Sequence, residues 1–133
     1  MAIKPIFGTV DALKKKLENL SVEDLKREMA ERKNLLLVDI REIQETVDLG
    51  TIPGAVHAPR GMLEFWVDPE SPYHKDVFAS GKRFVLYCQS GWRSALAAQT
   101  VTRMGLERVC HVGGGFSAWK ESGGPVETVP ERR

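Results

Sequence analysis

The sequence predicts an α/β fold built on a mostly parallel sheet. Three short apolar runs, residues 35–38, 84–87 and 109–112, are typical of strands that are buried on both faces. Segments in which apolar residues recur at helical spacing lie between these runs and before the first of them. Strands that alternate with helices favour a parallel sheet with right-handed crossovers. Functional sites in such folds lie beyond the carboxyl ends of the strands.

Length and composition favour one domain with a single core. The chain has 133 residues, of which 42% are hydrophobic. Its 19 basic and 18 acidic residues nearly cancel, which gives no indication of nucleic-acid binding. No stretch approaches the roughly 20 apolar residues of a membrane helix, and the amino terminus lacks the apolar core of a signal peptide. With two cysteines, no disulfide scaffold is expected, and the predicted location is a reducing cytoplasm.

A first helix is predicted over residues 9–20, with Thr9 as its cap. Its apolar residues recur at helical spacing and are Val10, Leu13, Leu17 and Leu20. We expect residues 1–20 to form a helical extension that packs on the main domain, residues 21–126. Three consecutive lysines at 14–16 are expected to form a solvated helix face.

A second helix is predicted to begin at Ser21. Ser21 and Asp24 resemble a capping box in which Asp replaces Glu, and an apolar stripe follows. The first apolar run comes next as a strand, and Asp39 ends it. A Pro-Gly turn over residues 52–55 then leads to Val56, which is expected to open a short strand.

Residues 59–81 form the least regular segment of the chain. Prolines and glycines interrupt it, yet its aromatic residues predict a loop that is packed down rather than disordered. Arg60 could reach an anionic ligand from this loop or could be an exposed loop arginine. Three further residues could line a pocket mouth or have surface and packing roles, namely Glu64, Trp66 and His74.

The carboxyl-terminal half continues the alternation of strands and helices. A helix over residues 94–104 is expected to end at Gly105. After the third apolar run, the glycines at 113–115 predict a turn into a short helical piece, residues 116–121. Residues 127–133 are expected to form a loose tail.

Cys88 has the sequence context of a reactive thiol. It follows the run 84–87 and precedes a glycine-containing turn and a helix. Backbone N–H groups converge at such a position and favour an anion, including the thiolate, which is the nucleophilic form of cysteine. Gly91 lets the backbone curl tightly, and Ser90 and Ser94 offer hydroxyl groups, although Ser94 could also be a plain helix cap.

The remaining residues after Cys88 add a cation and a large apolar side chain. Arg93 offers a permanent positive charge with a planar set of donors. Trp92 has no apolar stripe to join, so it could wall a pocket or face a partner. A cysteine at the end of an apolar strand can also be a small buried residue without chemistry. The glycine and the arginine at fixed offsets favour the reactive interpretation.

The segment Cys88-Gln89-Ser90-Gly91-Trp92-Arg93 resembles the active-site loop of single-domain rhodaneses, which reads Cys-x-x-Gly-x-Arg. Three other segments resemble family motifs in the family's order. Residues 37–42 resemble its Val-Asp-x-Arg strand, residues 50–55 its Gly-His-Ile-Pro-Gly-Ala turn, and residues 114–119 its closing Gly-Gly-x-x-x-Trp. Thr51 stands where the family often has His, and we expect this change to be structural.

The resemblance implies a rhodanese-like fold, with a central parallel sheet flanked by helices on both faces, and a thiosulfate sulfurtransferase-like activity. By this resemblance, Cys88 attacks the outer sulfur of a small anionic donor such as thiosulfate and becomes a persulfide. A thiol or protein acceptor then removes the sulfur, and Arg93 holds the donor. The residues expected to bind the donor are Gln89, Ser90, Gly91, Trp92, Ser94 and Arg60. No metal or other cofactor is expected.

Two other functions compete with this hypothesis. The domain could be a persulfide carrier or a protein-interaction module that turns over small donors poorly. It could also be a cysteine phosphatase, but that family spaces its residues as Cys-x5-Arg to wrap a tetrahedral phosphate. Four residues separate Cys88 from Arg93, and this shorter loop disfavours phosphoryl transfer. The sequence leaves the oligomeric state open.

Four further residues have competing interpretations. Asp39 and Arg41 could line the site, but a hydrogen-bonded structural pair is the favoured interpretation, because a buried carboxylate needs donors. Cys110 could be a resolving thiol for Cys88, but its strand context favours an inert buried side chain. Neighbours on a strand point to opposite faces, so Cys110 and His111 are not expected to share a metal ion.

Overall fold

The computed structural model describes residues 2–31 and 34–131. Five strands form one sheet in the order β1-β5-β4-β2-β3, and every neighbouring pair is parallel. The strands are β1 (Asn19–Leu20), β2 (Leu35–Asp39), β3 (Val56–His57), β4 (Arg83–Tyr87) and β5 (Val109–Val112). The predicted α/β fold with a parallel sheet is therefore confirmed.

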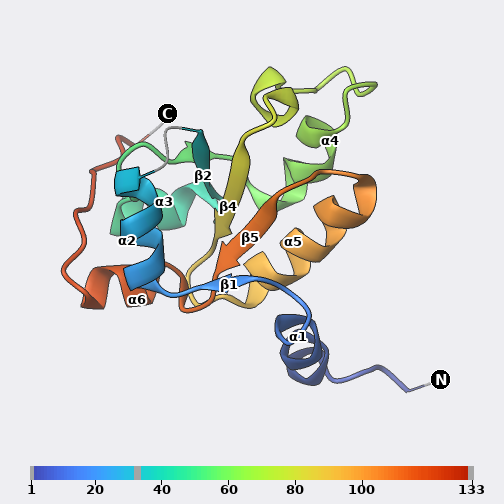
Figure 1. Ribbon diagram of the computed structural model, residues 1–133, viewed down its shortest axis with the longest axis horizontal. Helices are drawn as coiled ribbons and strands as arrows, with labels where there is room; N and C mark the ends of the chain where they lie inside the picture. The colour runs from blue at the N-terminus through green and yellow to red at the C-terminus, as the bar shows by residue number, and fades with distance from the viewer. Residues whose placement is uncertain (1, 32–33, 132–133) are drawn as a thin grey trace.

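Helices cover both faces of this sheet, as predicted. The α-helices are α1 (Ile6–Lys14), α2 (Val22–Glu31), α3 (Ile43–Leu49), α4 (Leu63–Val67), α5 (Trp92–Met104) and α6 (Gly115–Glu121). Figure 1 shows α2, α3 and α6 on one side of the sheet and α4 and α5 on the other. The irregular segment 59–81 is packed down and holds α4 and two short 3-10 helices, Arg60–Met62 and Asp76–Ala79.

The core consists of two apolar clusters, one on each face of the sheet. On one face, α5 contributes Ala97 and Val101, and the side chain of Cys88 joins them. On the other face, Phe116 and Trp119 of α6 pack with further apolar residues, including Cys110. The two cysteines therefore lie in different clusters, separated by the sheet.

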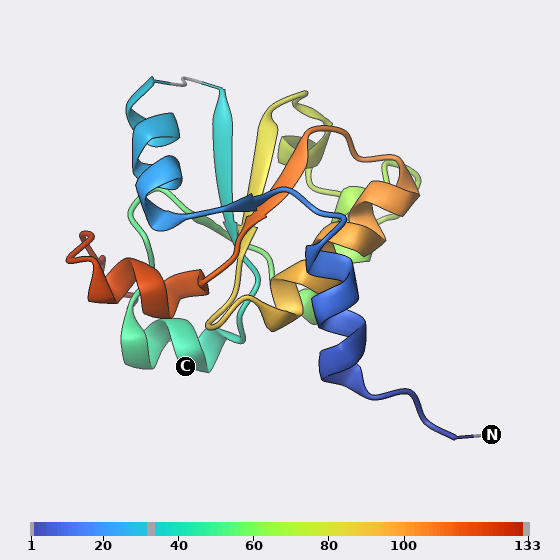
Figure 2. The ribbon, with the colours of Figure 1, turned by 60° about the horizontal axis from the view of Figure 1, so that its bottom comes forward.

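The first helix differs from its prediction at both ends. It begins at Ile6 and ends at Lys14, and the Thr9 hydroxyl donates to the carbonyl of Pro5 from inside the helix instead of capping it. The last two residues of the predicted helix form β1, which pairs with β5 at the edge of the sheet. Helix α1 packs against α5 (Figure 2).

Lys14 was predicted to be solvated, but it is half-buried and bonds to the protein. Its Nζ donates to the carbonyl oxygen of Gly113, 3.2 Å away, whereas Lys15 and Lys16 are exposed. The end of α1 is thereby tied to the turn after β5.

Other helix boundaries follow from local capping. The backbone N–H of Asp24 donates to the Ser21 hydroxyl at 3.1 Å, as expected for the start of α2. Helix α3 was not predicted, and Glu42 and Glu45 form its capping box. Helix α5 begins two residues earlier than predicted, directly after Gly91.

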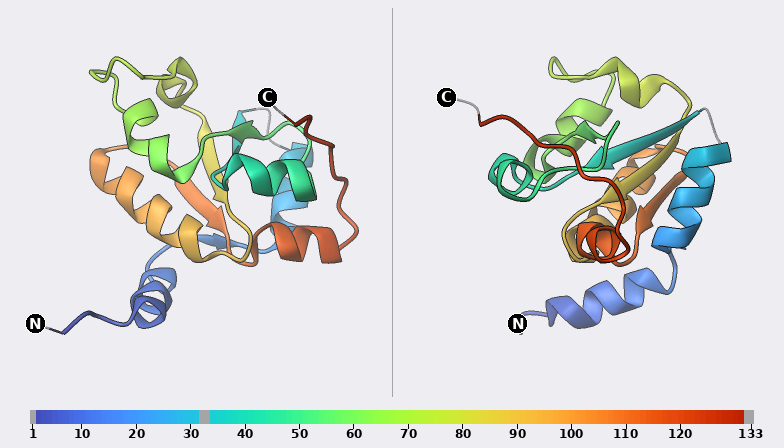
Figure 3. Two further views of the ribbon diagram at one scale, coloured as in Figure 1. Left: turned by 180° about the vertical axis from the view of Figure 1, so that it is seen from behind. Right: turned by 90° about the vertical axis from the view of Figure 1, so that its left-hand side faces the viewer.

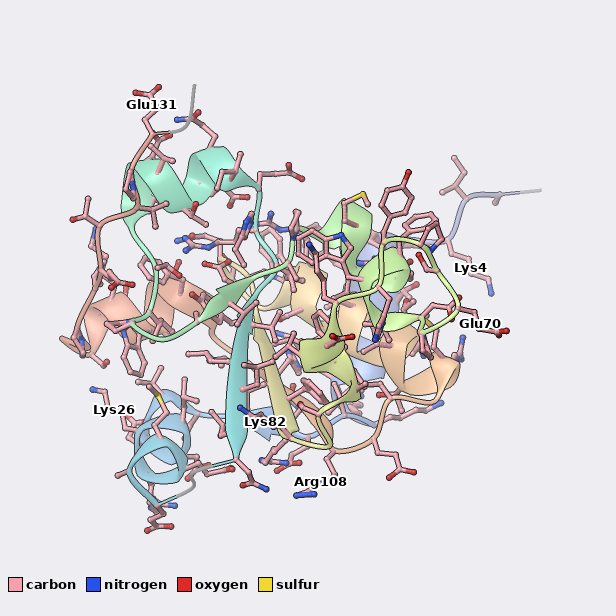
Figure 4. All side chains as sticks on the ribbon, turned by 90° about the horizontal axis from the view of Figure 1, so that it is seen from above. Lys4, Lys26, Glu70, Lys82, Arg108 and Glu131 are labelled. Carbon is pink, nitrogen blue, oxygen red and sulfur yellow. The ribbon has the colours of Figure 1, made fainter. Side chains whose placement is uncertain are left out.

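The carboxyl-terminal segment is tied down where it leaves the domain. Glu127, predicted to open a loose tail, exchanges two backbone hydrogen bonds with Thr51. The chain then runs past α3 to Glu131, and residues 132–133 of the predicted tail lie outside the described residues (Figure 4). Figure 3 shows α1 at the opposite end of the molecule from this segment.

The strands place their carboxyl ends together. Lys82 and Arg108, which precede β4 and β5, lie at one end of the sheet in Figure 4. The opposite ends of these strands lead into the segment that starts at Cys88 and into the turn at 113–114. The predicted site and the glycine turn therefore meet at the carboxyl-terminal ends of β4 and β5.

Candidate active site

Cys88 lies in a cradle of backbone N–H groups between β4 and α5. Its Sγ accepts hydrogen bonds from the N–H of Gly91 at 3.2 Å and of Ser94 at 3.3 Å. Both donors belong to the turn and first residues of α5, whose N-terminus carries partial positive charge. The Cys88 side chain is nearly buried, with 1% of the residue exposed, so water screens this field poorly. The arrangement stabilises negative charge on sulfur.

Two glycines allow the Cys88 loop, residues 88–93, to take this shape. Gly91 has φ of 89°, a left-handed conformation, and a Cβ atom there would clash with the carbonyl oxygen of Gly113. Gly115 has φ of 62°, and a Cβ atom would lie 2.7 Å from the carbonyl oxygen of Cys88. The glycine turn after β5 is thus a packing surface for the loop.

The N-terminus of α6 and the buried side chain of Arg41 form hydrogen bonds with the Cys88 loop. The carbonyl oxygens of Cys88 and Gln89 accept hydrogen bonds from the N–H groups of Phe116 and Ser117 at 2.8 and 3.0 Å. The Gln89 side chain donates to the Ser117 hydroxyl and accepts from Arg41 Nη1. Both ends of the Gln89 amide are therefore bonded within the protein, and its expected contact with a donor stays a prediction.

Arg41 forms the structural pair with Asp39 that the sequence favoured. Both side chains are fully buried, and Arg41 Nη2 lies 2.7 Å from Asp39 Oδ2. Thr51 and Tyr87 also donate to this carboxylate, so the residue at the family's usual His position completes a buried network. The Arg41 guanidinium lies 4.2 Å from the centre of the Phe116 ring. Through the bond from Arg41 to Gln89, this buried network holds the Cys88 loop in place.

Arg93 is held by a partner that the sequence did not suggest. Its two terminal nitrogens donate to the two carboxylate oxygens of Glu45, on α3, at 2.7 and 2.8 Å. The hydrogen bond from Arg93 lowers the pKa of Glu45, and the bond to Glu45 raises the pKa of Arg93. The expected role of Arg93 in holding a donor stays a prediction, and its observed contact joins α5 to α3.

The other predicted donor-binding residues differ in exposure and in the contacts that they make. Ser90 is half-buried in the loop. Trp92 is 50% exposed and meets Phe7 of α1 edge to face, with ring centres 4.8 Å apart. Arg60 pairs with Glu64 and approaches Thr100, about 9 Å of helix rise beyond Ser94. Of these residues, Gly91 and Ser94 contact the sulfur, whereas Arg60 contacts α5 at Thr100.

A buried chain of polar side chains behind Cys88 was missed by the sequence analysis. The Cys88 thiol lies 3.5 Å from the Ser94 hydroxyl, which lies 2.9 Å from His111 Nδ1. His111 Nε2 in turn lies 2.6 Å from Asn19 Oδ1. The one available signal was strand alternation, because His111 must point away from Cys110 and thus toward the Cys88 face.

Protonation of His111 is expected to destabilise the protein as the pH falls. Burial, together with the positive charge of Lys14, lowers the pKa of His111 from 6.5 to about 4. Between these values the unfolded chain binds a proton that the folded chain does not, so the free energy of unfolding decreases with falling pH. We expect a loss of about 2 kcal/mol between about pH 7 and pH 5.

Urea unfolding of the wild type and of His111→Asn at both pH values checks this prediction. The variant lacks the titrating group, so its loss over the same interval should be clearly smaller than that of the wild type. Equal losses in the two proteins would show that His111 does not govern this pH dependence.

Cys110 lies away from the Cys88 cradle. Neither cysteine forms a disulfide, and Cys110 is buried in the cluster on the far face of the sheet. Within residues 2–31 and 34–131, no group of three or more His, Cys, Asp or Glu side chains is placed to hold a metal ion. In the same part of the chain, no helix has the length and apolar character needed to cross a membrane.

Comparisons with known proteins agree with this geometry. Residues 21–122 match the model of the rhodanese-like domain family. A sulfurtransferase of Allochromatium vinosum is 33% identical over 115 residues, which cover 86% of this chain and 98% of that protein. The chain also matches two longer bacterial proteins, of which it spans 51% each.

Solved structures give the same fold. RPA3614 of Rhodopseudomonas palustris, a protein of unknown function described as a possible tyrosine phosphatase, is 43% identical with a TM-score of 0.90, covering 96% of this chain and 97% of that one. The human single-domain sulfurtransferase TSTD1 is 27% identical with a TM-score of 0.65, covering 77% and 95%. With the family match over most of its length and the cysteine cradle between β4 and α5, the chain belongs to the rhodanese-like domain family.

Proposed function

We propose that this protein is a sulfurtransferase that carries sulfane sulfur on Cys88 as a persulfide, with a small anionic donor such as thiosulfate. The observation that supports this most directly is the pair of N–H groups on Cys88 Sγ, from Gly91 and Ser94. These donors favour an anion on sulfur, as both the attacking thiolate and the persulfide require.

The proposed reaction has two displacement steps. In the first, the Cys88 thiolate attacks the outer sulfur of thiosulfate, a sulfur–sulfur bond forms to Cys88, and sulfite leaves with the electron pair of the broken bond. In the second, a thiol or protein acceptor attacks the outer sulfur, and Cys88 leaves as a thiolate. The cradle stabilises the thiolate at the start and at the end.

The proposed roles of the surrounding residues follow from their positions. We expect the backbone of residues 89–94 to surround the transferred sulfur, while the Gln89 side chain holds the loop to α6. Arg93 places a positive charge beside the loop, and negative charge on Cys88 is among the influences that raise the pKa of Arg93. Arg60 and Trp92 lie further out, where an anionic donor and a protein acceptor would approach.

Phosphoryl transfer is the competing function, because RPA3614 is described as a possible tyrosine phosphatase. A phosphatase loop would need its arginine to clamp a phosphate from above the cysteine. Here Arg93 is engaged by both oxygens of Glu45, and the loop has four residues between Cys88 and Arg93. Both features disfavour phosphoryl transfer, and the short loop suits the single sulfur atom that Cys88 is proposed to carry.

Treatment with thiosulfate is expected to add the mass of one sulfur atom to the intact protein. Cys88→Ser should abolish this adduct and the formation of thiocyanate from cyanide, because it removes the attacking thiolate. Cys110→Ser is the matched control and should retain both, since Cys110 lies across the sheet. Mass spectrometry of the three proteins gives the result.

Other outcomes separate the alternatives. Uptake of sulfur from a persulfidated protein with little turnover of thiosulfate would favour the carrier function. An adduct that persists in Cys88→Ser, or hydrolysis of p-nitrophenyl phosphate that depends on Cys88, would contradict the proposal.

A further inference from the structure

The direction of each hydrogen bond behind Cys88 can be derived from Asn19. Its Nδ2 donates to the carbonyl oxygens of Lys14 and Leu17, at 2.7 and 3.0 Å. The amide is thereby fixed with Oδ1 toward His111, and Oδ1 can only accept. His111 Nε2 must therefore carry the hydrogen, which leaves Nδ1 of the neutral ring as an acceptor.

The remaining bonds follow from this tautomer. His111 Nδ1 accepts from the Ser94 hydroxyl, so the lone pairs of Ser94 Oγ face the sulfur of Cys88. The Cys88 thiol donates to that oxygen. All four side chains point their donors the same way, from Cys88 through Ser94 and His111 to Asn19. Such an aligned chain can pass a proton from one end toward the other.

Ionisation of Cys88 conflicts with this alignment unless a proton moves. A thiolate would face the lone pairs of Ser94, because the hydroxyl hydrogen points at His111. If the hydroxyl turned to the sulfur instead, it would leave the buried Nδ1 without a donor, at a cost of about 1–3 kcal/mol. Ser94 and His111 are both fully buried, so water does not replace the lost bond.

Resting on the proposed function, we propose that His111 accepts the thiol proton of Cys88 through Ser94 when the sulfur becomes a thiolate. The S–H bond breaks as an O–H bond forms on Ser94, and the original O–H bond breaks as an N–H bond forms on His111 Nδ1. The products are a thiolate and an imidazolium. Afterwards Ser94 donates to sulfur, His111 donates to Ser94 and Asn19, and every hydrogen bond is kept.

The surroundings of His111 oppose its protonation until the thiolate forms. Burial and Lys14 keep the ring neutral in the resting protein, with its pKa lowered to about 4. The thiolate supplies the opposite charge at the moment of transfer and favours the imidazolium. Lys14 is the charged side chain on the neighbouring α1, and β1 and α5 present the neutral Asn19 and Ser94. His111 does not touch the sulfur and acts through Ser94.

The test uses the rate of sulfur loading from thiosulfate as a function of pH. His111→Asn can still accept a hydrogen bond from Ser94 but does not take up a proton near neutral pH. We expect the midpoint of its pH profile to move upward by about one unit or more, with a rate near neutrality about tenfold lower. At high pH, where water removes the thiol proton, the wild-type rate should return.

Two further variants frame this result. Ser94→Ala removes the bridging hydroxyl and keeps the backbone N–H of the cradle, so its profile should shift in the same direction. His74→Asn is a matched exchange outside the chain, on the loop near Asp76, and should follow the wild type. A rate loss of equal size at every pH in His111→Asn, or an unshifted profile in both site variants, would overturn the proposal.

A measurement without a sulfur donor separates this inference from the proposed function. In a Cys110→Ser background, the ultraviolet absorbance of the thiolate, taken as the difference from the same protein with Cys88→Ser, reports the ionisation of Cys88. An upward shift of this titration in His111→Asn, in a protein that takes up no sulfur, would retain the relay and refute the sulfurtransferase. Normal sulfur loading, with identical Cys88 titrations in the wild-type and His111→Asn proteins, would refute the relay and retain the sulfurtransferase. Circular dichroism confirms that each variant is folded.

Discussion

Gly91→Ala is expected to slow sulfur loading of Cys88 by about a hundredfold or more. The backbone N–H of Gly91 is one of two donors to Cys88 Sγ, and its φ of 89° points that N–H inward. A Cβ atom at this position would clash with the carbonyl oxygen of Gly113. The Cys88 loop must therefore move away from the glycine turn that follows β5. This displacement breaks the hydrogen bond from the residue 91 N–H to Cys88 Sγ. Stopped-flow measurement of sulfite release gives the rate.

Gly54→Ala is the matched control for this variant. Gly54 has φ of 85°, so both substitutions strain the backbone in the left-handed region by about 1–2 kcal/mol. A Cβ atom at Gly54 meets nothing within 4 Å, and the residue lies in the turn before β3. We expect Gly54→Ala to lose stability and keep its rate. A Gly91→Ala protein that loads sulfur as fast as Gly54→Ala would refute the role of the cradle.

Asp39→Ala is expected to lower the free energy of unfolding by about 3–5 kcal/mol. The substitution leaves the Arg41 guanidinium as an uncompensated charge in the core, since both side chains have no exposed surface. It also removes the acceptor for the hydroxyl groups of Thr51 and Tyr87. Urea unfolding measures the loss, and the slope with denaturant shows whether the transition stays cooperative.

Asp24→Ala provides the comparison with an exposed pair. Asp24 and Arg27 are 45% and 62% exposed and lie one helical turn apart, so their bond is worth at most about 1 kcal/mol. Arg41→Met should restore part of the stability in the Asp39→Ala background, because it removes the unpaired charge. Losses of similar size for Asp39→Ala and Asp24→Ala would show that the buried pair does not stabilise the fold.

Features that depend on neighbours in sequence were predictable. The apolar runs gave three of the five strands, and the glycine after Cys88 indicated the turn into α5. Strand β1 was not predictable, because Leu20 continues the helical spacing of Leu13 and Leu17 and only its pairing with β5 makes it a strand. Helix α3 is seven residues long, mostly polar, and has little apolar periodicity to reveal it.

The same distinction holds in the site. The six residues of the Cys88 loop are contiguous, so the position of the thiol could be read from the sequence. Glu45 meets Arg93 across 48 residues, and His111 meets Asn19 across 92, so neither pair has a local pattern. For Arg93, the residue type indicated an anionic partner, and the fold supplies the carboxylate of Glu45 from α3.

The docking of β1 determines when during folding the thiol reaches its final environment. Asn19 lies on a two-residue edge strand, and its contact with His111 closes the chain over 92 residues. Contacts over such distances have a larger loop-closure cost than the turn from β4 to α5 and form later on average. A partly folded chain would thus hold Cys88 in its loop with the orientation of His111 still unset. In such a chain the proposed proton acceptor of Cys88 is not yet in place, so we expect the full reactivity of the thiol only after β1 has paired with β5.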